Sequence, residues 1–296
     1  SQAYDYWKGV EDHSWVIGDF IWTAFDYIGE ASIGWCGYPL DKRIFPWNHA
    51  NCGDLNLSGE RRPQSYLRET LWSDAPVSHI VVTPPVPSFP LNPDKANWSV
   101  WDFPDVVDHW NFPGYEGKKM TVSVYSNCEQ VELFLNGESL GKQENTADKK
   151  NTLVWEVPYA HGILKAVSYN KGGEVGTATL ESAGKVEKIR LSADRTEIVA
   201  DGNDLSYITL ELVDSKGIRN QLAEELVEFS IEGDATIEGV GNANPMSIES
   251  FVANSRKTWR GSNLLVVRSG KSSGRIIVTA KVKALPVASI TITQKK

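Results

Sequence analysis

The chain has 296 residues and a formal net charge of −8, and hydrophobic residues make up 41% of it. This length suits two or three domains of about 100–150 residues each. The negative charge argues against a nucleic-acid partner, because phosphate binding needs clustered Lys and Arg. No apolar run approaches the roughly 20 residues of a membrane span, so membrane insertion is not expected, and the first residues lack the features of a signal peptide.

Residues 1–75 have the pattern of an α/β unit. Residues 16–22 (Val-Ile-Gly-Asp-Phe-Ile-Trp) are mostly apolar, which predicts a strand buried on both faces in a parallel sheet. A loop rich in Gly, Pro and Trp follows, and residues 63–72 then predict a short helix with Pro63 at its first position. One strand and one helix cannot close a hydrophobic core. The unit is therefore either incomplete or packed on the part that follows.

Residues 76–184 change to an alternating pattern with a period of two. Apolar side chains alternate with polar ones around three segments: 120–124, 131–135 and 153–157. Asn136-Gly137 is typical of a tight hairpin turn, and Lys171-Gly172 marks another turn. Short strands at this spacing indicate an antiparallel β-sandwich.

Residues 185–296 predict a second sandwich. The alternating segments are 208–212, 227–231 and 276–282. Residues 287–293 are either one more strand or the start of a linker. Lys281 and Lys283 resemble the charged residues that protect an exposed sheet edge from pairing.

Three carboxylates accompany the apolar run near the N-terminus, namely Asp19, Asp26 and Glu30. Glycoside hydrolysis needs two carboxylates that face one sugar from opposite sides. Residues at a single strand end seldom achieve this. We therefore expect Asp19 to form hydrogen bonds inside a barrel, and Asp26 and Glu30 to pin the following loop.

Trp22 ends the apolar run. The carboxyl ends of parallel strands are where barrel enzymes present ligand-facing residues, and an indole face can stack on a sugar ring. Trp22 is therefore the candidate substrate-binding residue, and a plain core tryptophan is the alternative.

Four other tryptophans offer a second kind of site: Trp98, Trp101, Trp110 and Trp259. Exposed and coplanar, they would form a platform for a polysaccharide. The alternative is that they pack junctions between domains and shield strand edges.

Cysteine and acidic residues do not indicate a metal centre. The three cysteines (Cys36, Cys52 and Cys128) fit neither a disulfide framework nor a zinc pattern, and we interpret them as packing residues, with a Cys36–Cys52 pair as the alternative. Residues 201–204 (Asp-Gly-Asn-Asp) lack the spaced ligands of a calcium loop and predict a turn. No cofactor is expected.

Residues 18–30 (GDFIWTAFDYIGE) resemble the eighth strand of the catalytic barrel in glycoside hydrolase family 2, the β-galactosidase family. Residues 51–66 resemble the loop and last helix of the same barrel. Further segments resemble the two immunoglobulin-like domains that follow the barrel in bacterial members: 111–114 and 131–137 in the first, and 239–245, 249–251 and 264–268 in the second. The resemblance covers essentially the whole chain.

This resemblance implies a mainly β fold, with two consecutive immunoglobulin-like β-sandwiches (76–184 and 185–296) after an incomplete (β/α)8-barrel remnant (1–75). In the family both catalytic glutamates precede the eighth strand. They are therefore expected upstream of residue 1, and the chain alone is expected to be inactive. The family's sugar-lining Trp maps onto Trp22. An asparagine–lysine motif of family β-glucuronidases is not evident after Trp22, which favours a galactosidase.

The resulting hypothesis is the C-terminal part of a retaining β-galactosidase-like hydrolase of terminal β-galactosides. The family's compartment would be periplasmic or extracellular, and a homo-oligomer remains open. Two alternatives are kept. The sandwiches are either a carbohydrate-binding accessory module or a purely structural scaffold for dimerisation.

Overall fold

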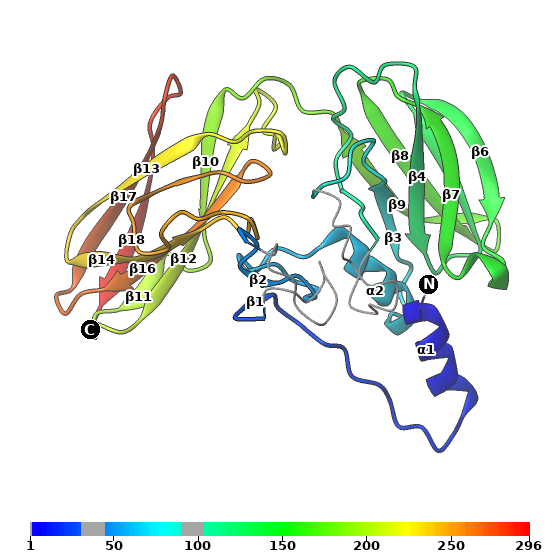
Figure 1. Cartoon of the computed structure of the whole chain (residues 1–296), viewed down its shortest axis with the longest axis horizontal. Coiled ribbons are helices and arrows are strands. Elements are labelled where there is room, and N and C mark those ends of the chain that lie inside the picture. The colour runs from blue at the N-terminus through cyan, green and yellow to red at the C-terminus, as the bar shows by residue number, and fades with distance from the viewer. Residues whose placement is uncertain (1, 31–44, 90–103) are drawn as a thin grey trace. The chain divides into compact units, whose positions relative to one another are not determined.

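A computed structural model describes residues 2–30, 45–89 and 104–296 (Figure 1). Among the described residues strands far outnumber helices, which confirms the predicted mainly β fold. They form two compact units; the second contains residues 45–48 and 183–296, and the first contains the rest. The helices are α1 (Gln2–Asp12) and α2 (Tyr66–Trp72), with 3-10 turns η1 (Pro63–Ser65) and η2 (Ala147–Lys149).

The first unit contains a β-sandwich. One sheet has the strand order β3 (Ser78–Val82), β4 (Lys119–Ser126), β7 (Thr152–Pro158). The other has the order β6 (Glu138–Glu144), β5 (Gln130–Leu135), β8 (Ile163–Asn170), β9 (Gly173–Glu181). All of these pairings are antiparallel, as the alternating sequence pattern predicts.

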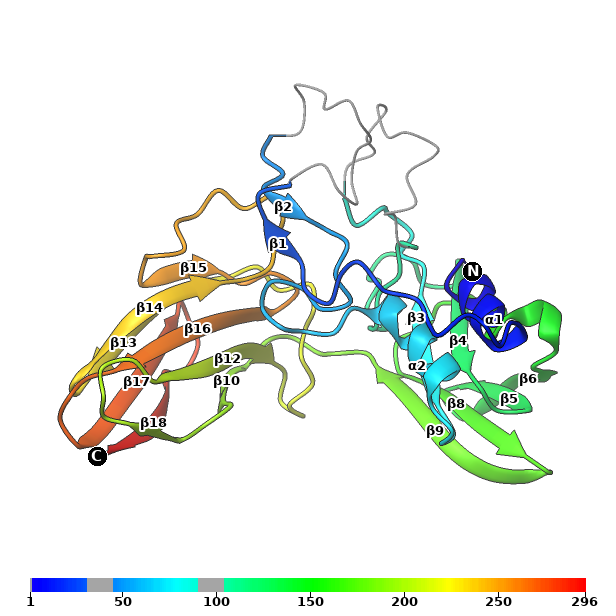
Figure 2. The same cartoon turned by 90° about the horizontal axis from the view of Figure 1, so that it is seen from below.

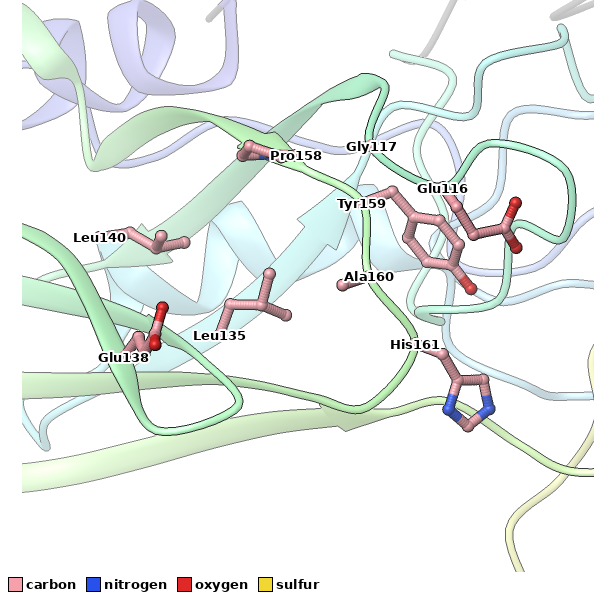
Figure 3. Close-up of a pocket in the computed structure, with 9 residues that line it drawn as sticks. All are labelled: Glu116, Gly117, Leu135, Glu138, Leu140, Pro158, Tyr159, Ala160 and His161. Atoms are coloured by element: carbon pink, nitrogen blue, oxygen red, sulfur yellow. The ribbon is translucent and has the colours of Figure 1, made fainter.

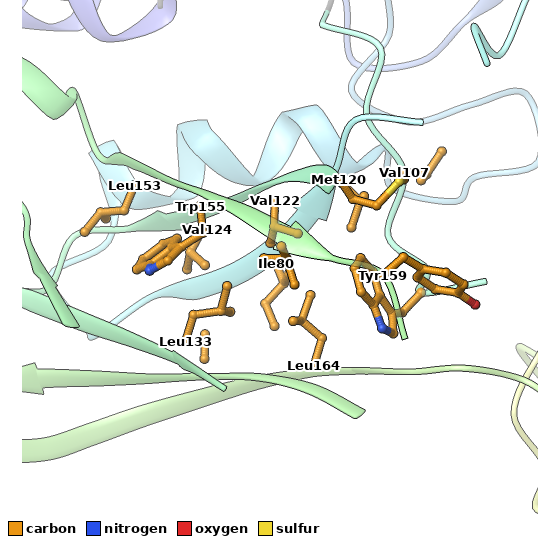
Figure 4. Close-up of a cluster of buried hydrophobic side chains, with 14 of the residues drawn as sticks. Ile80, Val107, Met120, Val122, Val124, Leu133, Leu153, Trp155, Tyr159 and Leu164 are labelled. Atoms are coloured by element: carbon orange, nitrogen blue, oxygen red, sulfur yellow. The ribbon is translucent and has the colours of Figure 1, made fainter. Parts of the chain in front are cut away.

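The core of this sandwich lies between its two sheets. Val122 and Val124 of β4 and Leu133 of β5 are fully buried, and Figure 4 shows Leu133 and Leu164 on the opposite side of the cluster from Val122 and Trp155. The hairpin turn between β5 and β6 is also as predicted. Asn136 and Gly137 both have positive φ, 51° and 88°, which is the conformation of the tight hairpin turn.

The second unit contains the other sandwich. One sheet has the order β10 (Lys188–Ala193), β12 (Leu205–Val213), β16 (Ser262–Ser269), β14 (Ala235–Gly241). The other has the order β11 (Glu197–Val199), β18 (Ala288–Lys295), β17 (Gly274–Val282), β13 (Leu226–Glu232), β15 (Ser255–Lys257). The sequence predicts that residues 287–293 are either one more strand or the start of a linker. From Ala288 onward they lie in strand β18, which pairs with β17 and β11.

The prediction for the two lysines of the second sandwich was wrong. Strand β17, which carries Lys281, pairs with β13 on one side and β18 on the other, so it is a central strand. Lys283 follows the end of this strand. Sequence alternation identifies a strand, but it does not tell an edge strand from a central one.

The predicted strand over residues 16–22 was also wrong. Figures 1 and 2 both show the segment between α1 and β1 (Tyr27–Ile28) without a strand. Its apolar side chains lie in solvent, with relative exposures of 103% for Ile17 and 102% for Phe20. The physical reason is that a strand needs a neighbouring strand for its backbone hydrogen bonds, and the described residues provide none for this segment.

The predicted helix over residues 63–72 is confirmed as η1 followed by α2, with Pro63 at its start. Leu67 of α2 packs against Val81 of β3 and Tyr125 of β4. The Asn151 side chain donates a hydrogen bond to Thr70 Oγ1 at 3.1 Å. The N-terminal region therefore packs on the first sandwich through α2. Neither described helix is long and apolar enough to cross a bilayer.

Candidate functional site

Trp22 lies on an exposed surface together with a phenol and a carboxylate. Its side chain is 59% exposed, and its indole Nε1 donates a hydrogen bond to the Tyr27 hydroxyl at 3.1 Å. The Tyr27 hydroxyl in turn donates to Glu30 Oε2 at 2.5 Å. Burial and the bond to Glu30 raise the pKa of Tyr27 to about 12, so the phenol keeps its proton at neutral pH. The three side chains form one hydrogen-bonded row.

The backbone beside this row is held by residues 52–55. Thr23 N donates to Cys52 O, and Asp54 N donates back to Thr23 O at 3.0 Å. Asp26 N donates to Leu55 O at 2.9 Å, and Phe25 and Leu55 form a parallel bridge. Strand β1 continues the pairing with β2 (His49–Ala50). A short two-segment frame therefore supports Trp22 and Tyr27.

Gly53 allows the two segments to come this close. A Cβ atom at this position would lie 2.3 Å from Asp26 N and 2.5 Å from Leu55 O. Real Cβ contacts are not this short, so the frame requires glycine at position 53.

A buried carboxylate fastens the frame. Asp26 is 3% exposed, and its Oδ1 accepts a hydrogen bond from Gly53 N at 2.9 Å. Arg62 forms a salt bridge with Asp26 and also donates to the side chain and backbone oxygens of Asn51. One guanidinium thus joins both segments of the frame to the start of η1. Buried ion pairs of this kind hold geometry strongly, because removing one partner leaves an uncompensated charge.

Burial dominates the electrostatics of this cluster. It raises the pKa of Asp26 to about 6, against the opposing effects of Arg62 and the Gly53 N–H. It lowers the pKa of His49, whose Nε2 lies 3.8 Å from Asp26 Oδ2, to about 4. It also raises the pKa of the Cys52 thiol to about 11, so this cysteine is not a nucleophile at neutral pH.

The carboxylate predictions have three outcomes. Asp26 pins the loop, as predicted. Glu30 takes part through Tyr27. The prediction for Asp19 was wrong, because its side chain is exposed and the segment around it is not part of a sheet. The sequence did not single out Arg62 or Gly53. Both lie far from Asp26 along the chain, so sequence spacing does not pair them with it.

The two tryptophans of this set that the structure describes, Trp110 and Trp259, do not form an exposed platform. Trp110 is fully buried, and its Nε1 donates to Ala160 O at 2.8 Å, which confirms the packing alternative for this residue. Trp259 is half-buried beside the guanidinium of Arg260. Trp98 and Trp101 lie outside the described residues.

Cys52 and Cys128 are buried with free thiols, as the packing interpretation expects, whereas Cys36 lies outside the described part of the chain. Asp201 Oδ1 accepts hydrogen bonds from the backbone N–H groups of Asn203 and Asp204, which confirms the predicted turn. Among residues 2–30, 45–89 and 104–296, no group of three or more His, Cys, Asp or Glu side chains could hold a metal ion.

Comparisons with known proteins identify the family of this chain. Residues 189–291 match the glycoside hydrolase family 2 C-terminal domain 5, and residues 117–176 match a domain of unknown function. A crystal structure of a family 2 member from Bacteroides cellulosilyticus is 99% identical, with a TM-score of 0.98, over 100% of this chain and 38% of that one. The chain belongs to glycoside hydrolase family 2. It corresponds to the C-terminal region of a family 2 protein.

Relatives with two different enzyme names match this chain. A β-galactosidase of Bacteroides ovatus is 31% identical over 98% of the chain and 30% of the relative. A putative β-glucuronidase of Formosa agariphila is 29% identical over 82% of the chain and 21% of the relative. The chain therefore spans less than a third of the length of either of these relatives.

Proposed function

We propose that this chain is the C-terminal region of a retaining glycosidase that acts on terminal β-galactosides. In this proposal residues 1–75 are the last strand and helix of a catalytic (β/α)8 barrel, and residues 76–184 and 185–296 are accessory sandwiches. The observation that supports it most is the row of Trp22, Tyr27 and Glu30 on its rigid frame. An aromatic face beside hydrogen-bonding groups is the composition that sugar sites use.

Trp22 would stack on the sugar in the cleaved position. The frame would set the angle of the indole, because binding energy helps catalysis only when it acts in the geometry of the transition state. The retaining mechanism needs an acid/base and a nucleophile about 5–5.5 Å apart. Asp26 is paired with Arg62, and Glu30 accepts a hydrogen bond from Tyr27. By the family resemblance, the catalytic pair would come from outside this chain.

Glu30 supports a galactoside over a glucuronide. An ionised carboxylate accepts hydrogen bonds only, so it suits the hydroxyl donors of a neutral sugar. The carboxylate of a glucuronide would meet a like charge next to Trp22, and like charges across an interface are unfavourable. The relatives include enzymes of both names, and in this proposal the charge of Glu30 favours the galactoside.

The test compares kcat/KM of the full-length protein on nitrophenyl β-galactoside and nitrophenyl β-glucuronide. We expect a preference for the galactoside. Glu30→Lys should move the ratio toward the glucuronide by about tenfold, equivalent to about 1.4 kcal/mol. The exposed strand variant Glu174→Gln is the matched control and should leave the ratio unchanged. A wild-type preference for the glucuronide would refute the proposed specificity.

A second measurement addresses the catalytic pair. The purified chain alone should show no hydrolysis of the galactoside. Hydrolysis by the chain that is abolished by Glu30→Gln would contradict the view that both catalytic glutamates lie elsewhere.

A further inference from the structure

A pocket of about 540 Å³ opens at one end of the first sandwich (Figure 3). It lies between β6 and β7, which are edge strands of the two different sheets. Further along, these edges are joined by hydrogen bonds from Trp155 Nε1 to Gly141 O at 3.3 Å and from Gln143 Nε2 to Val154 O at 2.8 Å. The pocket lies beyond these hydrogen bonds, where the edges of the two sheets separate.

The middle of the pocket is apolar. Leu135 ends β5 and Leu140 lies on β6, and both are only partly buried against the sandwich core. Pro158, at the end of β7, and Ala160 line the other side. Figure 3 shows these four side chains around one space, so the core surface of the sandwich is accessible there.

Polar groups stand at both ends of this apolar surface. Glu138 lies at one end, and Glu116 and His161 lie at the other, beside the Tyr159 ring (Figure 3). The Tyr159 ring is buried, and its hydroxyl accepts a hydrogen bond from Phe112 N at 3.1 Å, which fixes its position. Lys and Arg are absent from the described residues that line the pocket.

We propose that this pocket is an accessory binding site for a neutral saccharide unit. Glu116 and Glu138 can only accept hydrogen bonds when ionised, and sugar hydroxyls supply the donors they need. The C–H face of a sugar ring is apolar and would pack on Leu135 and Pro158. A uronic acid would meet two like charges without a cation to offset them. The pocket volume lies within the range of about 300–1,000 Å³ found for small-molecule sites.

This site is independent of the proposed activity, because it uses residues of the first sandwich alone. Its ligand would be held without being cleaved. Binding there would keep a glycan chain close to the protein and raise its effective concentration at any second site on the same molecule.

The experiment titrates the purified chain with lactose, galactose and glucuronic acid, followed by the NMR shifts of the side chains and amides around Leu140 and His161. We expect saturable shifts with the neutral sugars and none with glucuronic acid. Glu138→Ala and His161→Ala should each weaken lactose binding by about tenfold, the equivalent of one hydrogen bond. Both side chains are exposed, so the fold should be retained.

Two controls separate this site from others. Glu144→Ala changes an exposed carboxylate on the same strand β6 outside the pocket and should leave lactose binding unchanged. Trp22→Ala should leave the lactose-induced shifts around Leu140 and His161 unchanged, because Trp22 does not line this pocket. The proposal would be overturned if lactose gave no saturable shifts, or if binding were lost only in Trp22→Ala. It would also be overturned if glucuronic acid bound more tightly than lactose, or if the cation butylammonium saturated the site and sugars did not.

Discussion

The first sandwich and the segment before β1 differ in where their apolar side chains lie. In the sandwich, Leu133 and Trp110 are fully buried between sheets formed from this chain. In the segment before β1, Ile17 and Phe20 are fully exposed. Each region has apolar residues enough for a core, but only the sandwich has partner strands. Hydrophobic sequence alone therefore does not produce burial, because the backbone must also find hydrogen-bonding partners.

Removal of a buried sandwich residue should have the largest effect. We expect Trp110→Ala to lower the free energy of unfolding of the first sandwich by about 3–5 kcal/mol, because it leaves a large cavity and removes the hydrogen bond to Ala160. Urea unfolding followed by circular dichroism measures this. Val154→Ala, a half-exposed position on β7, is the control and should cost much less. Equal losses in the two variants would mean that Trp110 does not anchor this core.

The frame around Trp22 should respond to a single methyl group. Gly53→Ala places a Cβ against the backbone of residues 25, 26 and 55, so the two segments must separate, at a cost of about 1–3 kcal/mol. Hydrogen exchange of the Asp26 and Leu55 amides should accelerate accordingly. Gly176→Ala introduces a methyl group into open space on β9 and serves as the matched control. Unchanged exchange at both amides would show that the frame tolerates a wider spacing.

The same frame predicts two opposed pH dependences. Unfolded His49 takes up a proton near pH 6.5, whereas folded His49 resists it until about pH 4, so acidification in this window destabilises the frame. Asp26 has its pKa raised from 3.8 to about 6, so between these values the folded state binds the extra proton and acidification stabilises the frame. In the unmodified chain the two slopes should largely cancel between about pH 4 and 6.

Asp26→Asn removes one of these slopes. In this variant the protection of the Leu55 amide, corrected for intrinsic exchange, should fall by about 1.4 kcal/mol per pH unit as the pH drops from 6 to 4. His49→Gln should show the reverse trend. If both variants keep a flat profile, His49 and Asp26 do not titrate as their burial predicts.

The smallest effect is expected in the exposed segment. Phe20→Ser should change the stability of the purified chain by less than about 0.5 kcal/mol, because the side chain is fully exposed and has no packing to lose. It should also reduce self-association, since it breaks an exposed apolar run. Light scattering and urea unfolding measure the two effects. A loss of several kcal/mol would mean that Phe20 is buried in solution.

Sequence patterns predicted the parts of the fold that depend on local order. Alternation located β4, β5, β7, β12, β13 and β17, and the turn residues located the Asn136-Gly137 hairpin. They did not predict that Lys281 lies on a central strand, because strand order depends on contacts distant in sequence. The pairing of Asp26 with Arg62 was missed for the same reason, since 36 positions separate the two residues.

Another wrong prediction was the strand over residues 16–22, most of whose apolar side chains are exposed. Residues 16–22 have the composition of a buried strand, and the prediction treated composition as sufficient. The strand-like sequence and its exposed state agree once the segment is regarded as part of a catalytic domain that other residues complete. This is the central claim of the proposed function.

Hydrogen exchange measured by mass spectrometry tests this claim most directly, with the purified chain and the full-length protein compared side by side. We predict that residues 14–22 exchange rapidly in the chain alone and become strongly protected in the full-length protein, while β4, β5, β12 and β17 are protected in both. Rapid exchange of residues 14–22 in both proteins would contradict it, as would full protection of this segment in the chain alone.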